Sequence, residues 1–193
     1  MSEIDPIEFA ELRQRLMALE SEKAIRACLN RYMDLCDHLD ASTPMAELGE
    51  LFTGDAIWEG KGTRYASSFG GHQGRDAIVS MLGRYCLEPP HFALNVHYLT
   101  SEVITVDGDR AHGSWNMLQV SSFSAGGSHL NSARLEIDFR QEAGAWRMAR
   151  FQTRNLFSRP VDHWNSEAHL PVPEKSAGAS PGQTTRIQRE RQR

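Results

Sequence analysis

Cysteine is scarce in this sequence, and its scarcity excludes two kinds of site. Only Cys28, Cys36 and Cys86 are present, and no two of them form a Cys-x-x-Cys pair. Small secreted scaffolds held by disulfides are much richer in cysteine, and zinc or dithiol redox sites commonly use that close pair. We therefore expect no disulfide framework and no zinc site, and the simplest location is the reducing cytoplasm.

Long apolar runs and a one-sided charge are also missing. No stretch approaches the roughly 18 apolar residues that a membrane-spanning helix needs, and the amino-terminal stretch MSEIDPIEF lacks the pattern of a signal peptide. The 21 basic and 25 acidic residues leave a net charge of −4, with +3 on residues 174–193 and −7 on the rest. The basic end has no interleaved aromatic residues. We therefore expect neither a membrane nor a nucleic acid as partner.

The first half of the chain has the apolar spacing of helices. Apolar residues recur every three or four positions from Ile7 to about Cys36, which predicts two helices, or one interrupted near residues 20–21. The elements expected next are a helix over 45–52, capped by Ser42 or Thr43 and ended by Gly54-Asp55, a short strand at 56–59, a loop or irregular hairpin at 60–74, and a helix over 75–82.

Beyond Pro89-Pro90 the apolar period changes to two, which is typical of strands. Residues 133–140 show it best: Ala133, Leu135, Ile137 and Phe139 alternate with four charged residues, which predicts one buried and one solvated face. Four strands are expected, at 91–106, 110–123, 131–141 and 146–157, separated by glycine-containing turns.

Helices followed by a helix-covered antiparallel sheet indicate one α+β domain. The pattern predicts a helical extension at 1–20, a domain at 21–165 and a solvated, disordered basic tail at 166–193. A strongly curved sheet with helices over its concave side would enclose a pocket for a small molecule.

Two polar residues lie where apolar ones are expected. Asp37 falls where the apolar face of the first helical segment runs out, so it either caps a loop or points into a pocket. His97 lies in the otherwise apolar strand segment LNVHYL, either as a hydrogen-bonded core histidine or as half of an acid/base pair. Residues 34–40 hold three carboxylates, a thiol and an imidazole. We nevertheless expect no metal site, because the sequence has no second cluster of histidines with the spacing of metal ligands.

Several short motifs follow one another in a fixed order along the chain. They are the helix at 24–32, LFTGDAIW at 51–58, GRDAI at 74–78, HYLT at 97–100, VDGDRA at 106–111 and GAWR at 144–147. Their order and spacing resemble those of the SnoaL-like family of the nuclear transport factor 2-like superfamily. The resemblance covers roughly residues 20–160 and implies a cone-shaped α+β barrel, with a curved, mainly antiparallel sheet wrapped around helices and a deep apolar pocket.

The resemblance implies three catalytic residues. In the elimination enzymes of that superfamily an aspartate and a histidine form a dyad that abstracts a proton, and Asp37 and His97 match those positions. Tyr32 matches a pocket position that is tyrosine in a dehydrating member and lysine in a dehydrochlorinating one. A phenol can donate a hydrogen bond to a leaving hydroxyl or a carbonyl, so tyrosine favours dehydration.

The resemblance also implies a pocket lining, with two departures from the family. Gln119 stands where a dehydrating member has an acidic residue, and an amide orients a ligand but does not transfer a proton. Phe151 stands where the dehydrochlorinase has an arginine, although the neighbouring Arg150 leaves the register open. The expected substrate-binding residues are Trp58, Phe92, Met117, Gln119, Leu135, Phe151 and Asn155.

Two functions follow as hypotheses. The first is a cofactor-independent lyase of the dehydratase kind, or an isomerase, that acts on a small apolar, cyclic or steroid-like alcohol or ketone. The second is a non-catalytic protein of the same fold that binds a hydrophobic small molecule. By the same resemblance we expect no cofactor and no metal, and a homo-oligomer, dimer or trimer, formed through the outer face of the sheet.

Overall fold

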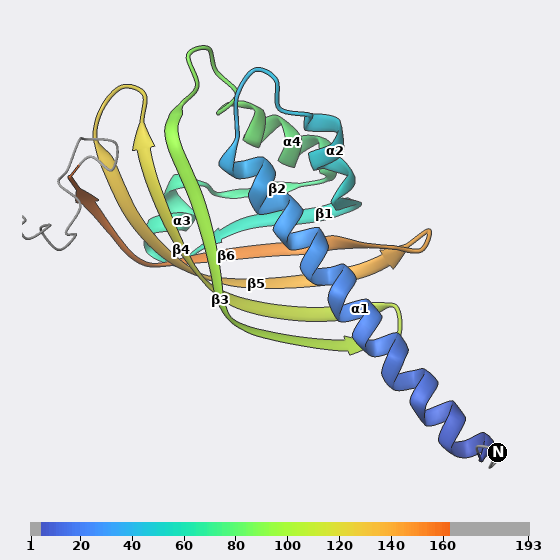
Figure 1. Cartoon of the computed structure of the whole chain (residues 1–193). Helices are drawn as coiled ribbons and strands as arrows, with labels where there is room; N and C mark the ends of the chain where they lie inside the picture. The colour runs from blue at the N-terminus through green and yellow to red at the C-terminus, as the bar shows by residue number, and fades with distance from the viewer. Residues whose placement is uncertain (1–4, 163–193) are drawn as a thin grey trace, which may run out of the picture.

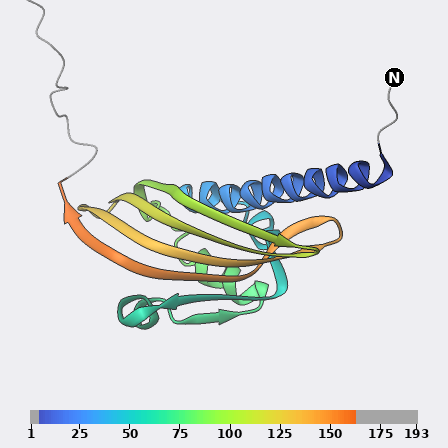
Figure 2. The same ribbon diagram turned by 90° about the horizontal axis from the view of Figure 1, so that it is seen from below.

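The computed structural model describes residues 5–162 and shows an α+β domain, as predicted (Figure 1). Its long carboxy-terminal strands bend strongly, and α1 runs beside one edge of the sheet (Figure 2). The helices are α1 (Pro6–Asp37), α2 (Met45–Glu50), α3 (Gly62–Ser68) and α4 (Arg75–Gly83). The strands are β1 (Phe52–Lys61), β2 (Gly71–Gln73), β3 (Phe92–Asp107), β4 (Arg110–Phe123), β5 (Ser128–Glu142) and β6 (Ala145–Val161).

The sheet has six strands in the order β2-β1-β6-β5-β4-β3. Successive strands from β3 to β6 are antiparallel hairpin neighbours, and β2 is antiparallel to β1. The exception is β1, which pairs in parallel with β6 and places Trp58 opposite Phe151. The prediction of a curved, mainly antiparallel sheet around helices is thereby confirmed.

The alternation predicted for residues 133–140 is present in β5. Ala133, Leu135, Ile137 and Phe139 are buried, while the charged residues between them lie on the outer face. Because successive side chains of a strand point to opposite faces, this one strand fixes which side of the sheet faces the core. The concave side carries the core and the cavity described below.

The first helical segment is a single helix of 32 residues rather than two. Asp5 begins it by accepting a hydrogen bond from the backbone N–H of Ile7 at 3.0 Å, and Pro6 occupies the first turn, where it loses no helical hydrogen bond. The buried face starts only at Ile25 and continues to Cys36, whereas residues 5–20 are exposed on all sides. The predicted extension at 1–20 is thus, over its described part, the projecting half of α1.

Two local predictions are wrong. Residues 60–74 are not a loop, because β1 continues to Lys61 and the chain then forms α3 and β2. Gly60 permits this packing, since a Cβ there would lie 2.3 Å from the carbonyl oxygen of Tyr65, and Gly62 has a positive φ of 74°.

The helix expected over 45–52 ends at Glu50, because Phe52 joins β1 opposite Met148 of β6 and is fully buried. Gly54 and Asp55 therefore lie inside β1 rather than ending the helix. Pro44 is the N-cap, and neither Ser42 nor Thr43 caps α2 with its side chain.

Two further expectations concern the basic tail and membrane-spanning helices. The basic tail expected at 166–193 lies outside them. Among residues 5–162 no helix is long and apolar enough to cross a bilayer.

Candidate functional site

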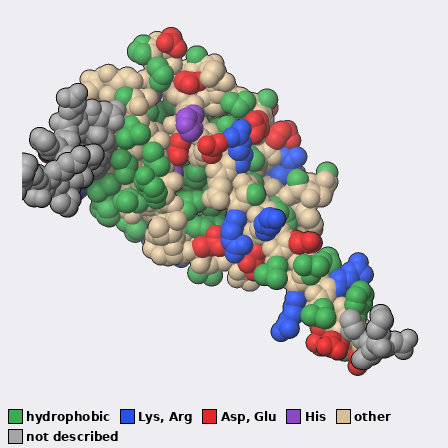
Figure 3. Space-filling view, viewed as in Figure 1, with side chains coloured by type: hydrophobic (Ala, Val, Ile, Leu, Met, Phe, Trp, Pro, Cys, Tyr) green, Lys and Arg blue, Asp and Glu red, His purple; other side chains and the backbone are tan. Residues whose placement is uncertain are grey.

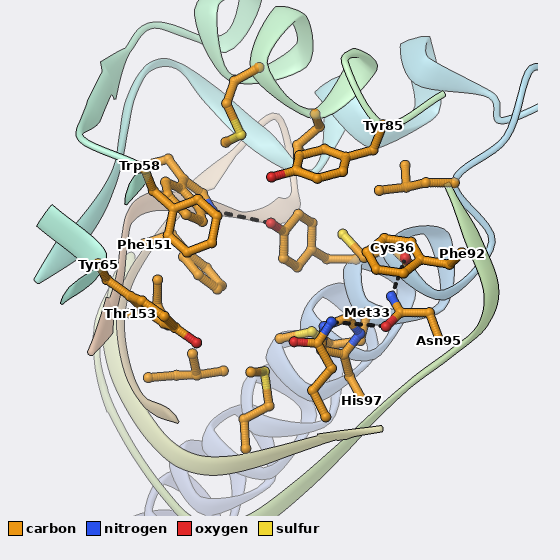
Figure 4. Close-up of a pocket in the computed structure, with 18 residues that line it drawn as sticks. Met33, Cys36, Trp58, Tyr65, Tyr85, Phe92, Asn95, His97, Phe151 and Thr153 are labelled. Atoms are coloured by element: carbon orange, nitrogen blue, oxygen red, sulfur yellow. Dashed lines mark hydrogen bonds between the residues drawn. The ribbon is translucent and has the colours of Figure 1, made fainter. Parts of the chain in front are cut away.

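A cavity of about 150 Å³ lies between the concave face of the sheet, α1 and α4 (Figure 4). Its wall is mostly aromatic and aliphatic, and a few polar groups interrupt it on one side. The residues that line it are Tyr32, Met33, Cys36, Leu39, Trp58, Tyr65, Phe69, Met81, Leu82, Tyr85, Phe92, Asn95, His97, Met117, Gln119, Leu135, Phe151 and Thr153.

His97 and Asp37 form a hydrogen-bonded pair at the polar side of this wall. The Nδ1 atom of His97 lies 2.5 Å from Oδ1 of Asp37, and the backbone N–H of His97 donates to Oδ2 at 3.3 Å. Their side chains are 10% and 15% exposed, so water screens the pair only weakly. Asp37 is the last residue of α1 and His97 lies in the middle of β3, so the fold joins groups that are 60 residues apart.

The pair fixes the state of the imidazole. An ionised carboxylate only accepts hydrogen bonds, so the proton between the two groups belongs to Nδ1 and the lone pair of a neutral ring is on Nε2. No other hydrogen bond to the ring occurs within residues 5–162, and His97 lines the cavity. Within the described residues, Nε2 is therefore the ring nitrogen left to accept a proton.

A second polar network orients Gln119 beside His97. Nδ2 of Asn95 donates to the carbonyl oxygen of Cys36 at 3.0 Å, which fixes the orientation of the Asn95 amide. Its Oδ1 then accepts from Nε2 of Gln119 at 2.8 Å and from Oγ of Ser121 at 2.7 Å. Because the amide nitrogen of Gln119 is held by Asn95, its Oε1 is available as an acceptor at the cavity wall.

The opposite side of the cavity is aromatic (Figure 4). Trp58 stacks on Phe151 with ring centroids 5.6 Å apart, and its Nε1–H donates to the hydroxyl oxygen of Tyr32 at 3.1 Å. Tyr32 also packs edge-on against Phe52 at 5.5 Å. Burial raises the pKa of Tyr32 well above its ordinary value of 10. The phenol therefore stays protonated and can itself donate a hydrogen bond.

The structure brings most of the residues expected at the site to this one cavity. Tyr32, His97 and six of the seven expected binding residues line it, and Asp37 lies behind His97. Asn155 is not among the lining residues. Its amide donates to the carbonyl oxygens of Ser132 at 3.4 Å and Phe157 at 3.0 Å, further along β6 than Thr153.

Sequence reasoning missed two polar residues of this wall, Asn95 and Thr153. It also missed eight others, namely Met33, Cys36, Leu39, Tyr65, Phe69, Met81, Leu82 and Tyr85. Asn95 is only 6% exposed and stands two residues before His97 on the same face of β3. A second polar residue on an apolar strand face was the signal that could have identified it. Thr153 stands two residues after Phe151 on the same face of β6, and it is also buried.

A second histidine–aspartate pair lies on the outer face of the sheet. Nδ1 of His112 lies 2.8 Å from Oδ1 of Asp138, but these side chains are 56% and 52% exposed. They have the chemistry of the buried pair without its enclosure. Among residues 5–162 there is no group of three or more histidine, cysteine or acidic residues that could hold a metal ion.

A family model described as SnoaL-like domain matches residues 17–152. A hexachlorocyclohexane dehydrochlorinase (LinA) Type2 superposes with a TM-score of 0.62 at 17% identity, over 81% of this chain and 96% of that one. A scytalone dehydratase, described as putative, from Novosphingobium aromaticivorans superposes with a TM-score of 0.61 at 21% identity, over 81% and 97% of the two chains.

A third solved structure is an NTF2-like protein with a cystatin-like fold, from the same organism. It gives a TM-score of 0.57 at 25% identity, over 80% of this chain and 92% of that one. No protein of curated function matches the sequence. Together these matches show the fold that the chain shares with its neighbours.

Proposed function

The chain belongs to the SnoaL-like domain family, and from this premise we propose that it is a cofactor-independent lyase that removes water from a small cyclic substrate. The observation that carries the proposal is the pair of His97 and Asp37, 2.5 Å apart at the wall of an apolar cavity. Two structural neighbours are described as a dehydrochlorinase and a scytalone dehydratase, which supports an elimination. Both neighbours are at most 21% identical to this chain, so the chemical argument is made from the residues of this chain's own site.

The proposed reaction is the dehydration of a β-hydroxy ketone. Nε2 of His97 takes the proton on the carbon next to the carbonyl, and the electrons of that C–H bond form the new C=C bond as the C–O bond to the hydroxyl breaks. The imidazolium returns the proton to the departing hydroxide, which leaves as water and regenerates neutral His97. Asp37 stabilises the imidazolium between the two transfers.

Two other groups orient the substrate. The protonated hydroxyl of Tyr32 donates to the carbonyl oxygen, where negative charge develops as the proton is removed. Oε1 of Gln119 accepts from the substrate hydroxyl and holds it on the His97 side of the cavity. This assignment explains an amide at position 119, because the role needs an acceptor and no proton transfer.

The cavity limits the size of the substrate. An engineered apolar cavity of about 150 Å³ in another protein accommodates benzene, and the volume here is also about 150 Å³. A single six-membered ring fits this space, so we propose single-ring alcohols and ketones as the substrates to test first.

The alternative is a protein that binds such a molecule without converting it. Phe151 favours this alternative, because it places an aromatic ring where the dehydrochlorinase-like pattern has a polarising cation. The two functions differ in the role of Asp37. A binding protein needs the shape of the cavity, whereas the lyase needs the carboxylate behind the ring.

The test uses 3-hydroxycyclohexanone as the probe. Ultraviolet absorbance follows the enone product, and NMR in D₂O follows exchange of the proton next to the carbonyl. Asp37→Asn keeps the size of the side chain but brings an amide N–H against a donor of His97, and we expect it to lower both rates roughly 10²–10⁴-fold. His97→Ala should have at least this effect.

The exposed pair supplies the matched control. Asp138→Asn makes the same chemical change beside His112 on the outer face, and both rates should stay at the wild-type level. Circular dichroism establishes that each variant is folded. A wild-type protein that binds the probe but neither exchanges its proton nor releases enone would establish the binding alternative instead.

A further inference from the structure

The projecting half of α1 carries an apolar stripe that nothing in the described chain covers. Phe9, Leu12, Leu16 and Leu19 are 49–61% exposed, and residues 5–20 have no buried member. Figure 3 shows hydrophobic side chains at the surface of the projecting half, among charged ones. Figure 1 shows this half of the helix extending beyond the end of the sheet. The family match begins only at residue 17, so most of this segment lies outside the part of the chain that the family model matches.

The stripe faces away from the domain. Each of its four residues stands sixteen positions before a buried residue of α1, namely Ile25, Cys28, Tyr32 and Leu35. Sixteen residues correspond to about 160° around an α-helix. A partner that covers the stripe therefore approaches from the side opposite the sheet, and the domain does not obstruct it.

The spacing within the stripe is that of a coiled coil. Phe9, Leu12, Leu16 and Leu19 are separated by three, four and three residues, so they occupy the a and d positions of two heptads. The next a and d positions are Lys23 and Arg26, whose like charges would end such a contact. Arg26 is engaged instead by Glu22 and Glu102 of its own chain.

The charges beside the stripe fit a second copy of this chain in one orientation. In this register Glu8 and Arg15 hold g positions, and Arg13 and Glu20 hold e positions. In a parallel pair of helices each g residue faces the e residue five positions later on the other helix. Glu8 then faces Arg13 of the partner subunit, and Arg15 faces Glu20 of the partner subunit, so all four symmetry-related contacts are attractive.

These four charged side chains are available for such contacts. None of them takes part in an ion pair among residues 5–162. An antiparallel pair that aligns the same four apolar layers would instead bring Arg13 close to the partner's Arg13, and Arg15 close to the partner's Arg15. Charge complementarity therefore selects the parallel arrangement.

We propose that two copies of this chain dimerise through residues 8–20 of α1 as a parallel, in-register coiled coil, with the two domains on its outer sides. An anionic membrane fits the segment poorly, because residues 5–22 hold five acidic and only two basic side chains, whereas interfacial helices are rich in lysine and arginine. This contact differs from the sheet-to-sheet assembly that the family resemblance led us to expect.

The first experiment measures the mass of the full-length protein in solution. We expect light scattering after size exclusion to give about 43 kDa, twice the 21.7 kDa of one chain. Leu16→Glu should weaken the dimer roughly 30-fold or more, because it places a charge in the centre of the contact. Met17→Glu is the matched control, since Met17 is as exposed as Leu16, both at 56%, but lies outside the stripe. A monomer, a trimer, or a dimer that Leu16→Glu leaves intact would overturn the proposal.

The second experiment tests the orientation. Glu8→Arg should weaken the dimer by bringing two arginines together, and the added Arg13→Glu change should restore it. In a parallel, in-register pair, residue 12 meets its own copy, so Leu12→Cys should give a disulfide-linked dimer under oxidising conditions. Met17→Cys should not. Failure of both the charge rescue and the cross-link, in a protein that remains dimeric, would refute the parallel arrangement.

Discussion

Removing the hydroxyl of Tyr32 should cost stability through Trp58 rather than through lost packing. The Tyr32→Phe change keeps the ring that packs on Phe52 and Phe151 and deletes only the oxygen that accepts from Nε1 of Trp58 at 3.1 Å. Both residues are buried, so the indole N–H is left without a partner. An unsatisfied buried donor costs about 1–3 kcal/mol. For a domain of this size we expect a loss of roughly 2–12 °C in Tm.

Calorimetry and urea unfolding of a double-mutant cycle isolate this effect. Tyr32→Phe is compared in the wild type and in a Trp58→Phe background, where no N–H remains to be orphaned and the change should be close to neutral. If Tyr32→Phe costs nothing in the wild type, or costs the same in both backgrounds, the hydrogen bond does not stabilise the fold as argued. Activity measured on the same variants then separates the proposed donation to substrate from the structural effect.

Two further predictions concern groups with shifted pKa values. Burial raises the pKa of Cys36 to about 12, so its thiolate fraction near pH 8 is only about 10⁻⁴. Mass spectrometry after iodoacetamide treatment should therefore find Cys86 modified well before Cys36. Equal rates of modification would show that Cys36 is accessible and ionised. Burial by itself would raise the pKa of Glu59, but hydrogen bonds from Lys61, Gln152 and Arg150 outweigh it and hold this pKa at about 2. Because the pKa of Glu59 in the folded protein lies below the ordinary 4.5, its stabilisation of the fold is present above pH 4.5 and is lost as the pH falls toward 2. The wild type should therefore lose more resistance to urea between pH 6 and pH 3 than Glu59→Gln. Equal losses in the two proteins would show that the Glu59 carboxylate does not stabilise the fold in this way.

The strands could be predicted where their pattern is local. In β5 each inward position from Ala133 to Phe139 is apolar and each outward one from Arg134 to Arg140 is charged, so eight residues sufficed to assign its two faces. The continuity of α1 stayed open because its apolar stripe changes sides between Leu19 and Ile25, from the surface that faces away from the domain to the one that packs on it. A sequence pattern records both stripes without showing which of them is buried.

Contacts between distant segments account for the local errors. α3 depends on Tyr65, which packs on Phe69 and closes over Gly60, and nothing in a run of glycine and serine indicates that contact. Phe52 has an apolar side chain that suits a helix or a strand, and its parallel pairing with Met148 of β6 places it in a strand. The meeting of Asp37 and His97 could not be deduced from spacing either, and it was expected only because of the family resemblance.

The position of β1 beside β6 also sets the order in which the chain can complete its fold. During synthesis β1 emerges about ninety residues before the strand that it pairs with in parallel. Until then Phe52 and Trp58 lack the partners that bury them in the finished sheet, and a bare strand edge with large apolar side chains invites pairing with other chains. The last strand thus closes both the sheet and the aromatic wall of the cavity. A nascent chain that stalls before residue 145 would be aggregation-prone and without a site, however well its earlier helices had formed.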